Sequence, residues 1–229
     1  MYDYECSFCN EILGSNYNNF FNIYIENDFK KCGLNNRIVG ETKNYLLMPM
    51  VGPLVPGYLL LLPKEHYSSF ANMDEEQIEE AICIKNIVKK LFYKYYGKSV
   101  VFEHGALNKL KKGACCSDHA HLHIVATPVD VMDCFSDYGF DVREIDSLKE
   151  VRCQVSRNMP YLFYEDFEGK SILMDAPIVE TQFIRKLLAT KMGEKDRSLW
   201  NKNIHVDWMI DIIKKLKNEI GIKLKEQIY

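Results

Sequence analysis

The feature that most constrains this sequence is a run of three histidines that alternate with apolar residues. The run reads His119-Ala120-His121-Leu122-His123-Ile124-Val125. In a β-strand, side chains point to opposite faces in turn, so the three imidazoles share one face and the apolar side chains share the other. Neighbouring imidazoles would lie roughly 6 to 7 Å apart, which suits a shared phosphate group better than a shared metal ion. The pattern therefore predicts a strand with one chemical face, on which the histidines have different roles.

The composition is that of a globular protein without a general attraction for polyanions. Of the 229 residues, 47% are hydrophobic and 27% are charged, and the formal net charge is -3. These values give no drive toward nucleic acid, so we expect no nucleic-acid partner. The N-terminus lacks a basic region followed by an apolar run, and no apolar stretch approaches the ~20 residues of a membrane helix. We therefore expect a cytoplasmic protein with no membrane partner.

The eight cysteines are interpreted as reduced thiols and metal ligands, because no secretion signal accompanies them. Cys6 and Cys9 form a CxxC motif near the N-terminus. This motif alone is compatible with half of a zinc site, a redox pair or two unrelated thiols. Zinc is favoured only if further ligands are found.

Three apolar segments bounded by Gly, Pro and Asn predict strands at residues 37–42, 45–50 and 57–63. Pro63 ends the third of them, and His66 follows almost at once. Functional groups are often presented in loops at the ends of strands, although a surface-loop histidine is the plainer interpretation of His66.

From Asp74 the apolar residues recur at intervals of three and four, which predicts an amphipathic helix that ends at Gly97. Asp74 and Gln77 form a candidate capping box, and the charged residues of the helix are interpreted as solvated surface. Residues 99–103 return to strand. The loop that follows carries lysines that form either an anion-binding lip or plain solvated surface, at Lys109, Lys111 and Lys112.

The remainder of the chain has weaker patterns. Residues 141–151 predict a short helix, and residues 160–164 and 170–174 predict a hairpin. Two further amphipathic segments, at residues 181–192 and 207–228, predict helices. No internal repeat or low-complexity linker separates this part from the rest.

Taken in order, these elements resemble the histidine-triad (HIT) family of nucleotide hydrolases and transferases. The resemblance rests on the triad, the CxxC motif and the Pro-Lys-x-His sequence at the end of a strand, and it covers roughly residues 5–128. It implies an α+β fold in which residues 1–128 form a catalytic domain, with an antiparallel sheet and a long amphipathic helix. Residues 129–229 would then be a mainly helical C-terminal extension packed on that domain.

The same resemblance implies roles for the histidines. His121 would be the nucleophile that attacks the α-phosphorus of a nucleotide and forms a nucleotidyl-histidine intermediate, and His123 would contact the phosphate. Family members with an N-terminal CxxC hold a structural zinc ion with two cysteines and two histidines. Here these ligands correspond to Cys6, Cys9, His66 and His119.

The candidate substrate contacts lie where the sequence departs from the family pattern. Many members have a serine three residues before the triad, and here Cys116 occupies that place with Ser117 next to it. Glu103-His104-Gly105 stands where the family often has Asn followed by Gly, which makes Glu103 and Gly105 further candidates. A carboxylate there would repel phosphate unless lysines compensate or Glu103 points elsewhere.

The third triad residue helps to choose among functions, because related transferases and phosphorylases commonly carry glutamine where this chain has His123. We therefore expect a hydrolase that cleaves a nucleoside monophosphate from an attached group. The alternatives are a nucleotidyltransferase or phosphorylase that uses the same histidine, and a non-catalytic zinc-stabilised nucleotide-binding module. Gln182 and Arg185 either reach the substrate or are solvated. Small relatives are often homodimers, so a homodimer is a candidate assembly.

Overall fold

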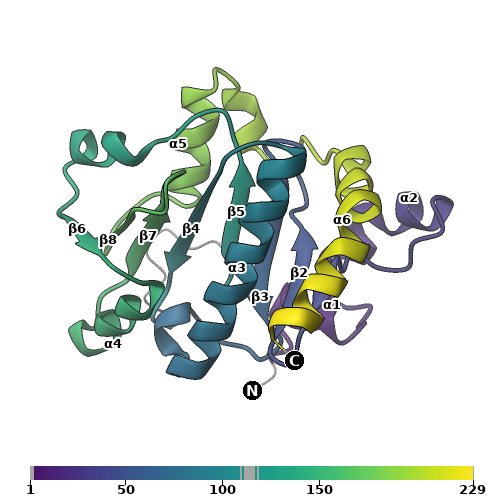
Figure 1. The fold of residues 1–229 in the computed structure, drawn as a ribbon, viewed down its shortest axis with the longest axis horizontal. Coiled ribbons are helices and arrows are strands. Elements are labelled where there is room, and N and C mark those ends of the chain that lie inside the picture. Colours follow the sequence, from purple (N-terminus) through teal and green to yellow (C-terminus); the bar gives the residue numbers. More distant parts are fainter. Residues whose placement is uncertain (1–2, 109, 111–116, 118, 229) are drawn as a thin grey trace.

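A single antiparallel sheet of eight strands crosses the protein in the computed structural model, which describes residues 3–108, 110, 117 and 119–228 (Figure 1). The strand order is β1-β2-β3-β5-β4-β7-β8-β6. The strands are β1 (Gly40–Glu41), β2 (Tyr45–Pro49), β3 (Tyr58–Pro63), β4 (Ser99–Gly105), β5 (Leu122–Ala126), β6 (Val142–Ile145), β7 (Tyr161–Glu165) and β8 (Ser171–Asp175). The last three of these strands come from the expected C-terminal extension and continue the sheet beyond β4.

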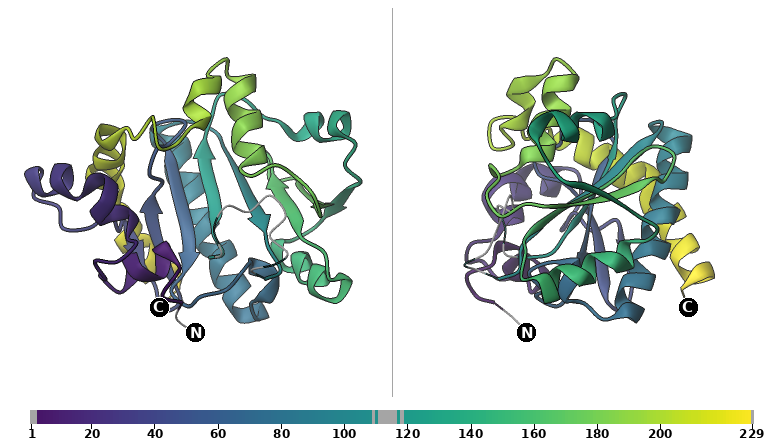
Figure 2. Two further views of the ribbon diagram at one scale, coloured as in Figure 1. Left: turned by 180° about the vertical axis from the view of Figure 1, so that it is seen from behind. Right: turned by 90° about the vertical axis from the view of Figure 1, so that its left-hand side faces the viewer.

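Helices cover both faces of this sheet. The α-helices are α1 (Ser7–Ile12), α2 (Glu26–Lys31), α3 (Glu75–Tyr95), α4 (Cys153–Arg157), α5 (Phe183–Lys191) and α6 (Val206–Gln227), with the short helical turns η1 (Phe21–Ile25), η2 (Phe70–Asn72), η3 (Met132–Tyr138), η4 (Leu148–Arg152) and η5 (Lys195–Ser198). Helices α3 and α6 lie over one face, and α1 and α5 lie over the other (Figure 2). Among the described residues, no helix is both long enough and apolar enough to span a bilayer.

Alternation along the central strands separates the core into two halves. Leu59 and Leu61 of β3 pack with α3 and α6, while Leu60 and Leu62 pack on the opposite side. Strand β5 lies between β3 and β4, and its His123 is paired with Leu60 on one side and with Phe102 on the other. The face of β5 that carries His123 is therefore the face covered by α1 and α5.

Most predicted elements are present. The α+β fold is confirmed, the capping box of Asp74 and Gln77 begins α3, and the predicted hairpin is β7 and β8. The short helix predicted at residues 141–151 is wrong for its first half, because residues Val142–Ile145 form the edge strand β6 on β8. A capping box formed by Ser147 and Glu150 begins η4 only after that strand has ended.

One charged group on α3 is not solvated surface, contrary to the sequence prediction. Lys85 is 7% exposed, and the amino groups of Lys85 and Lys89 both contact the carboxylate of Glu165 on β7. Burial lowers the pKa of Lys85, and the neighbouring Glu165 carboxylate opposes that shift. This buried ion pair ties the long helix to the strands contributed by the extension.

Candidate active site and metal site

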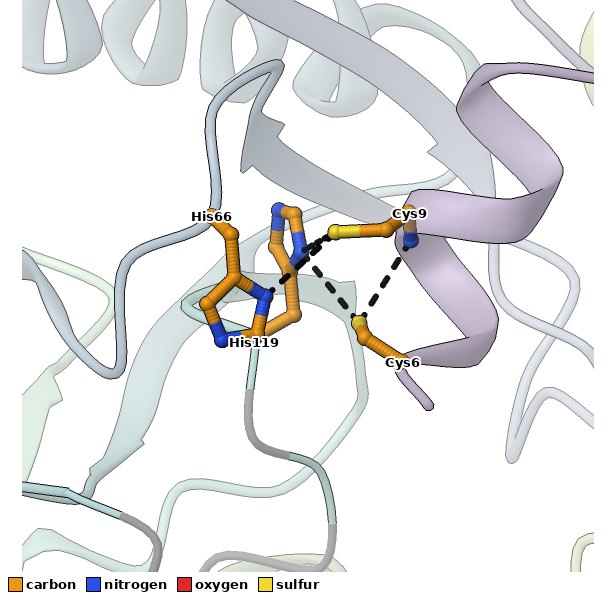
Figure 3. Close-up of side chains that lie close together, drawn as sticks. All are labelled: Cys6, Cys9, His66 and His119. Atoms are coloured by element: carbon orange, nitrogen blue, oxygen red, sulfur yellow. Dashed lines mark hydrogen bonds between the residues drawn. The ribbon is translucent and has the colours of Figure 1, made fainter. Parts of the chain in front are cut away.

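Two cysteines and two histidines from three distant parts of the chain meet beside the sheet (Figure 3). Cys6 and Cys9 lie at the start of α1, where the Cys6 sulfur caps the helix by accepting the Cys9 backbone N–H at 3.4 Å. His66 follows β3, and His119 precedes β5. Their candidate ligand atoms all lie within 4.8 Å of one another.

The spacing of these atoms fits a tetrahedral metal site. With metal–sulfur bonds of about 2.3 Å and metal–nitrogen bonds of about 2.0–2.1 Å, a tetrahedron requires sulfur–nitrogen separations of about 3.6 Å. The Cys9 sulfur lies 3.4 Å from Nδ1 of His66 and 3.5 Å from Nδ1 of His119, and the Cys6 sulfur lies 3.5 Å from the same His119 nitrogen. The four residues therefore form a candidate metal site of the kind that prefers zinc.

The surroundings of this cluster orient its ligands. Nε2–H of His119 donates to the backbone carbonyl of Pro63 at 2.8 Å, which leaves Nδ1 free to bind a metal. Nε2 of His66 lies 3.8 Å from the carboxylate of Asp3. The pKa of the Cys9 thiol is lowered, first by a hydrogen bond from the Cys6 thiol and then by His119 and His66, so the site favours a thiolate.

Helix α1 is held in place by an ion pair as well as by the cysteines. Arg37 is 1% exposed, and its Nε and Nη2 donate to the two carboxylate oxygens of Glu11 on α1 at 2.6 and 2.8 Å. Its Nη1 donates to the backbone carbonyl of Pro49. Such a bidentate pair fixes orientation as well as distance, so it positions α1 beside the end of β2.

His121 has a defined tautomer. Its Nδ1–H donates to the backbone carbonyl of His119 at 2.7 Å, so Nε2 carries the lone pair. Burial lowers the pKa of His121 to about 4. The ring of Phe8 on α1 lies 5.4 Å from that of His121, and the ring of His123 lies 4.6 Å from it. His121 is therefore a neutral imidazole in contact with two neighbouring rings.

His123 lies within β5, whereas His121 precedes that strand. Its ring stacks on Phe102 of β4 with centroids 4.4 Å apart, and its Nδ1 lies 2.8 Å from the hydroxyl of Tyr58 on β3. The pKa of His123 is well below its ordinary value, first because the ring is buried, and then because His121, His104 and Arg185 disfavour a further positive charge. This histidine is also neutral at pH 7.

A fourth histidine, His104, shares this face, and the sequence reasoning did not assign it a role. The strand prediction ended at residue 103, but β4 continues through His104, which therefore lies on the same side as Phe102 and His123. Its Nε2 accepts the backbone N–H of Ile184 at the start of α5 at 3.2 Å. Burial lowers its pKa to about 3. His104 thus connects the histidine face to the extension. A prediction that continued β4 through residue 104 would have placed His104 on the same face as Phe102.

The histidines open into a pocket of about 240 Å³. His121, His123 and Ser117 line it, as expected from the sequence for a shared site. Other lining residues lie outside the central strands, among them the aromatic residues Phe8, Phe20 and Trp200 and the polar residue Gln182. Nothing in the local sequence indicated that Phe20 and Trp200, 180 positions apart, would meet, although their rings lie 5.6 Å apart.

Two of the sequence candidates for substrate contact lie away from this pocket. Glu103 lies on the opposite face of β4, where its buried carboxylate accepts from the backbone N–H of Phe70 at 2.9 Å and from the Tyr161 hydroxyl at 2.5 Å. Gly105 packs against Tyr161, whose ring atoms lie 2.2 Å from where a Cβ would be. Neither Glu103 nor Gly105 lines the pocket. Cys116 and the three loop lysines considered as an anion-binding lip lie outside the described residues.

Comparisons with known proteins found a family match over part of the chain. The HIT domain family model matches residues 33–128. An uncharacterized HIT-like protein of Borreliella burgdorferi is 28% identical over 121 residues, which are 48% of this chain and 78% of that protein. A HIT-like protein involved in cell-cycle regulation from Bartonella henselae is 20% identical with a TM-score of 0.37, covering 56% of this chain and 82% of that one. A zinc-bound histidine triad family protein from Mycobacterium smegmatis is 16% identical with a TM-score of 0.33, covering 59% and 95%.

The matched range contains the whole triad together with His66, and only the two cysteines of the candidate metal site precede it. Residues 33–128 of this chain therefore form a HIT domain.

Proposed function

We propose that this protein is a nucleotide hydrolase that cleaves a nucleoside monophosphate from an attached group, with His121 as the nucleophile. One observation carries the proposal. The Nδ1–H of His121 is engaged by the carbonyl of His119 at 2.7 Å, which leaves the Nε2 lone pair available in a pocket that also contains His123. A neutral, oriented imidazole with a free lone pair is what covalent catalysis at phosphorus requires.

In the first step, Nε2 of His121 attacks the α-phosphorus, and a phosphorus–nitrogen bond forms as the bond to the leaving group breaks. The leaving group departs with the bonding electron pair and takes a proton from solvent where it needs one. His123 donates a hydrogen bond to the phosphate oxygens as their charge increases. Ser117, which lines the same pocket, is proposed to contact the leaving group.

In the second step, water attacks the same phosphorus atom. The phosphorus–nitrogen bond breaks, its electron pair returns to Nε2 of His121, and a proton goes to solvent. The products are the nucleoside monophosphate and the free enzyme. Dividing one displacement into two through a covalent intermediate lowers the barrier of each.

The aromatic part of the pocket is proposed to bind the nucleoside. Phe8, Phe20 and Trp200 present apolar ring surfaces next to the histidines. A purine or pyrimidine base is flat and stacks well on such rings. The nucleoside would then lie between α1 and Trp200, with its α-phosphate facing His121.

Zinc is proposed as a structural ion held by Cys6, Cys9, His66 and His119. When bound, zinc would stabilise the fold and would take no part in the reaction, because four protein ligands complete a tetrahedral site and leave no position for water. These ligands would join α1, and with it Phe8, to the segment that carries His121.

Turnover of two small substrates, adenosine phosphoramidate and a diadenosine polyphosphate, tests the proposal. We expect AMP from at least one of them, and a loss of at least about a thousandfold in kcat for His121→Ala. His205→Asn is the matched control, because His205 lies at the start of α6 and does not line the pocket. Equal activity of wild type and His121→Ala, or no turnover by either, would contradict the proposal.

The two alternative functions give different products. A phosphorylase would release a nucleoside diphosphate when inorganic phosphate replaces water, and a nucleotidyltransferase would pass the nucleotide to an added acceptor. A binding module would bind AMP without turnover of either substrate. Product analysis with and without inorganic phosphate separates these outcomes from hydrolysis.

A further inference from the structure

Tyr58 makes a contact with the triad that the proposed reaction does not yet use. Its side chain is fully buried, and its hydroxyl lies 2.8 Å from Nδ1 of His123. Tyr58 pairs with Val125 in the sheet, and Leu60 pairs with His123, so the tyrosine and the histidine are diagonal neighbours on one face of β3 and β5. The contact therefore follows from the strand register.

A buried cation lies against the same tyrosine. Arg185 of α5 is 2% exposed, and its guanidinium carbon lies 5.7 Å from the centre of the Tyr58 ring. It donates to the backbone carbonyls of Gly52 at 2.5 Å, Arg197 at 2.9 Å and Ser198 at 3.2 Å. Within the described part of the chain no carboxylate forms an ion pair with it, and its Nη1 is buried without a hydrogen-bond partner.

This charge has two effects on the pair formed by Tyr58 and His123. A cation over a phenol ring draws electron density from it, so the hydroxyl becomes a better donor and a poorer acceptor. An uncompensated positive charge nearby also opposes protonation of the imidazole, in the same direction as burial does. Both effects favour a neutral His123 whose Nδ1 accepts the Tyr58 proton.

The tautomer matters because a neutral imidazole has only one N–H. If Nδ1 accepts from Tyr58, the proton must reside on Nε2, where it can be donated to a phosphate oxygen. If Nδ1 instead donated to the tyrosine oxygen, Nε2 would present a lone pair to an anion and repel it. The partner of Nδ1 therefore decides whether His123 can stabilise the transition state.

We propose that Tyr58 is a positioning residue, supported by Arg185 of the extension, which donates to Nδ1 of His123 and thereby holds the Nε2–H tautomer that serves the phosphate. The role of that tautomer in the reaction rests on the proposed function. The tautomer itself does not, so the two can be tested separately.

The direct test is ¹⁵N NMR of the histidine side chains in the substrate-free protein, with the His123 resonances assigned by their loss in His123→Gln. In wild type we expect an unprotonated Nδ1 and a protonated Nε2. In Tyr58→Phe we expect a shift toward the Nδ1–H tautomer. A protonated Nδ1 in wild type would overturn the proposal, whatever the catalytic activity of the protein.

Kinetics supply the second readout. Tyr58→Phe should lower kcat about tenfold, as expected for a lost hydrogen bond that acts in the transition state, and change KM by less than about twofold. Tyr45→Phe is the control, because Tyr45 is equally buried but its hydroxyl donates to the backbone carbonyl of Gln77 at 2.9 Å, on the other face. Unchanged kcat in Tyr58→Phe, or the same loss in Tyr45→Phe, would contradict the proposed role.

Arg185→Met tests the part assigned to the cation. The same shift toward the Nδ1–H tautomer is expected, because the charge that makes the hydroxyl a donor is gone. An unchanged His123 tautomer in a folded Arg185→Met protein would overturn the contribution of Arg185.

Discussion

At the scale of single residues, each triad histidine has one ring nitrogen with a hydrogen-bond partner. That partner determines whether the other ring nitrogen carries a proton or a lone pair. His119 donates from Nε2 to Pro63 and turns Nδ1 toward the two thiols. His121 donates from Nδ1 to the carbonyl of His119 and keeps Nε2 free. His123 has its Nδ1 engaged by Tyr58. The three evenly spaced histidines therefore have three different hydrogen-bonding environments.

The triad histidines can be recognised from the sequence because the motif is local, but the sequence could not predict which face Glu103 occupies. Glu103 immediately precedes His104, so a shift of one position in the strand register exchanges their faces. The pairing of Phe102 with His123 places Glu103 on the side of α3. Glu103 therefore does not line the pocket that contains His121 and His123.

The buried Glu103 predicts a specific pH dependence of stability. Burial raises its pKa from 4.5 to about 7. A raised pKa in the folded state means that this carboxyl stabilises the fold fully below pH 4.5 and that the stabilisation is lost as pH rises toward 7. The shift corresponds to at most about 3 kcal/mol.

Urea unfolding of wild type and Glu103→Gln at a series of pH values measures this effect. Relative to the glutamine variant, wild type should lose stability between pH 4.5 and about 7. Glu76→Gln, at an exposed position of α3, should leave the pH dependence as in wild type. A constant difference between wild type and Glu103→Gln across this range would show that Glu103 is not the titrating group.

At the scale of elements, local sequence patterns predicted α3. They did not predict strand β6 or the position of Trp200 in the pocket. Helix α3 has its own cap and a clear apolar period, whereas β6 is a four-residue edge strand that is defined only by its pairing with β8. Trp200 reaches the pocket because Arg185 binds the carbonyls of Arg197 and Ser198 just before it. Contacts between distant segments of this kind leave no trace in a local pattern.

Helix α1 is short, and two of the four candidate metal ligands, Cys6 and Cys9, lie at its start. We expect purified protein to retain about one zinc ion per chain after dialysis. Cys6→Ser should reduce the metal content below about a tenth of an equivalent and lower the midpoint of thermal unfolding, because folding and metal binding are coupled. Cys32→Ser, at an exposed cysteine, is the control.

Mass spectrometry measures the zinc content of each variant, and thermal unfolding with and without a chelator measures the effect of zinc on stability. Less than about a tenth of an equivalent of zinc in wild type, with no response to added zinc, would contradict the metal assignment. Loss of zinc from Cys32→Ser as well would point to binding outside the cluster.

At the scale of the whole molecule, the expected extension and the HIT domain share one sheet and one pocket. Strand β7 pairs with β4 along five residues, and Glu165 of β7 binds the two lysines of α3. Gln182 and Trp200 line the pocket that contains His121. The boundary at residue 128 remains a prediction from the sequence, but residues on both sides of it build the candidate site.

The central claim is that His121 forms a bond to phosphorus, and the most direct measurement is to trap that bond. Wild-type protein would be mixed with adenosine phosphoramidate and quenched within milliseconds in alkaline denaturant, since phosphorus–nitrogen bonds to histidine hydrolyse in acid. Peptide mass spectrometry should find an adenylyl group on His121 in wild type and in His205→Asn, and none in His121→Ala. Turnover without an adduct on His121, at a rate that His121→Ala matches, would contradict the account.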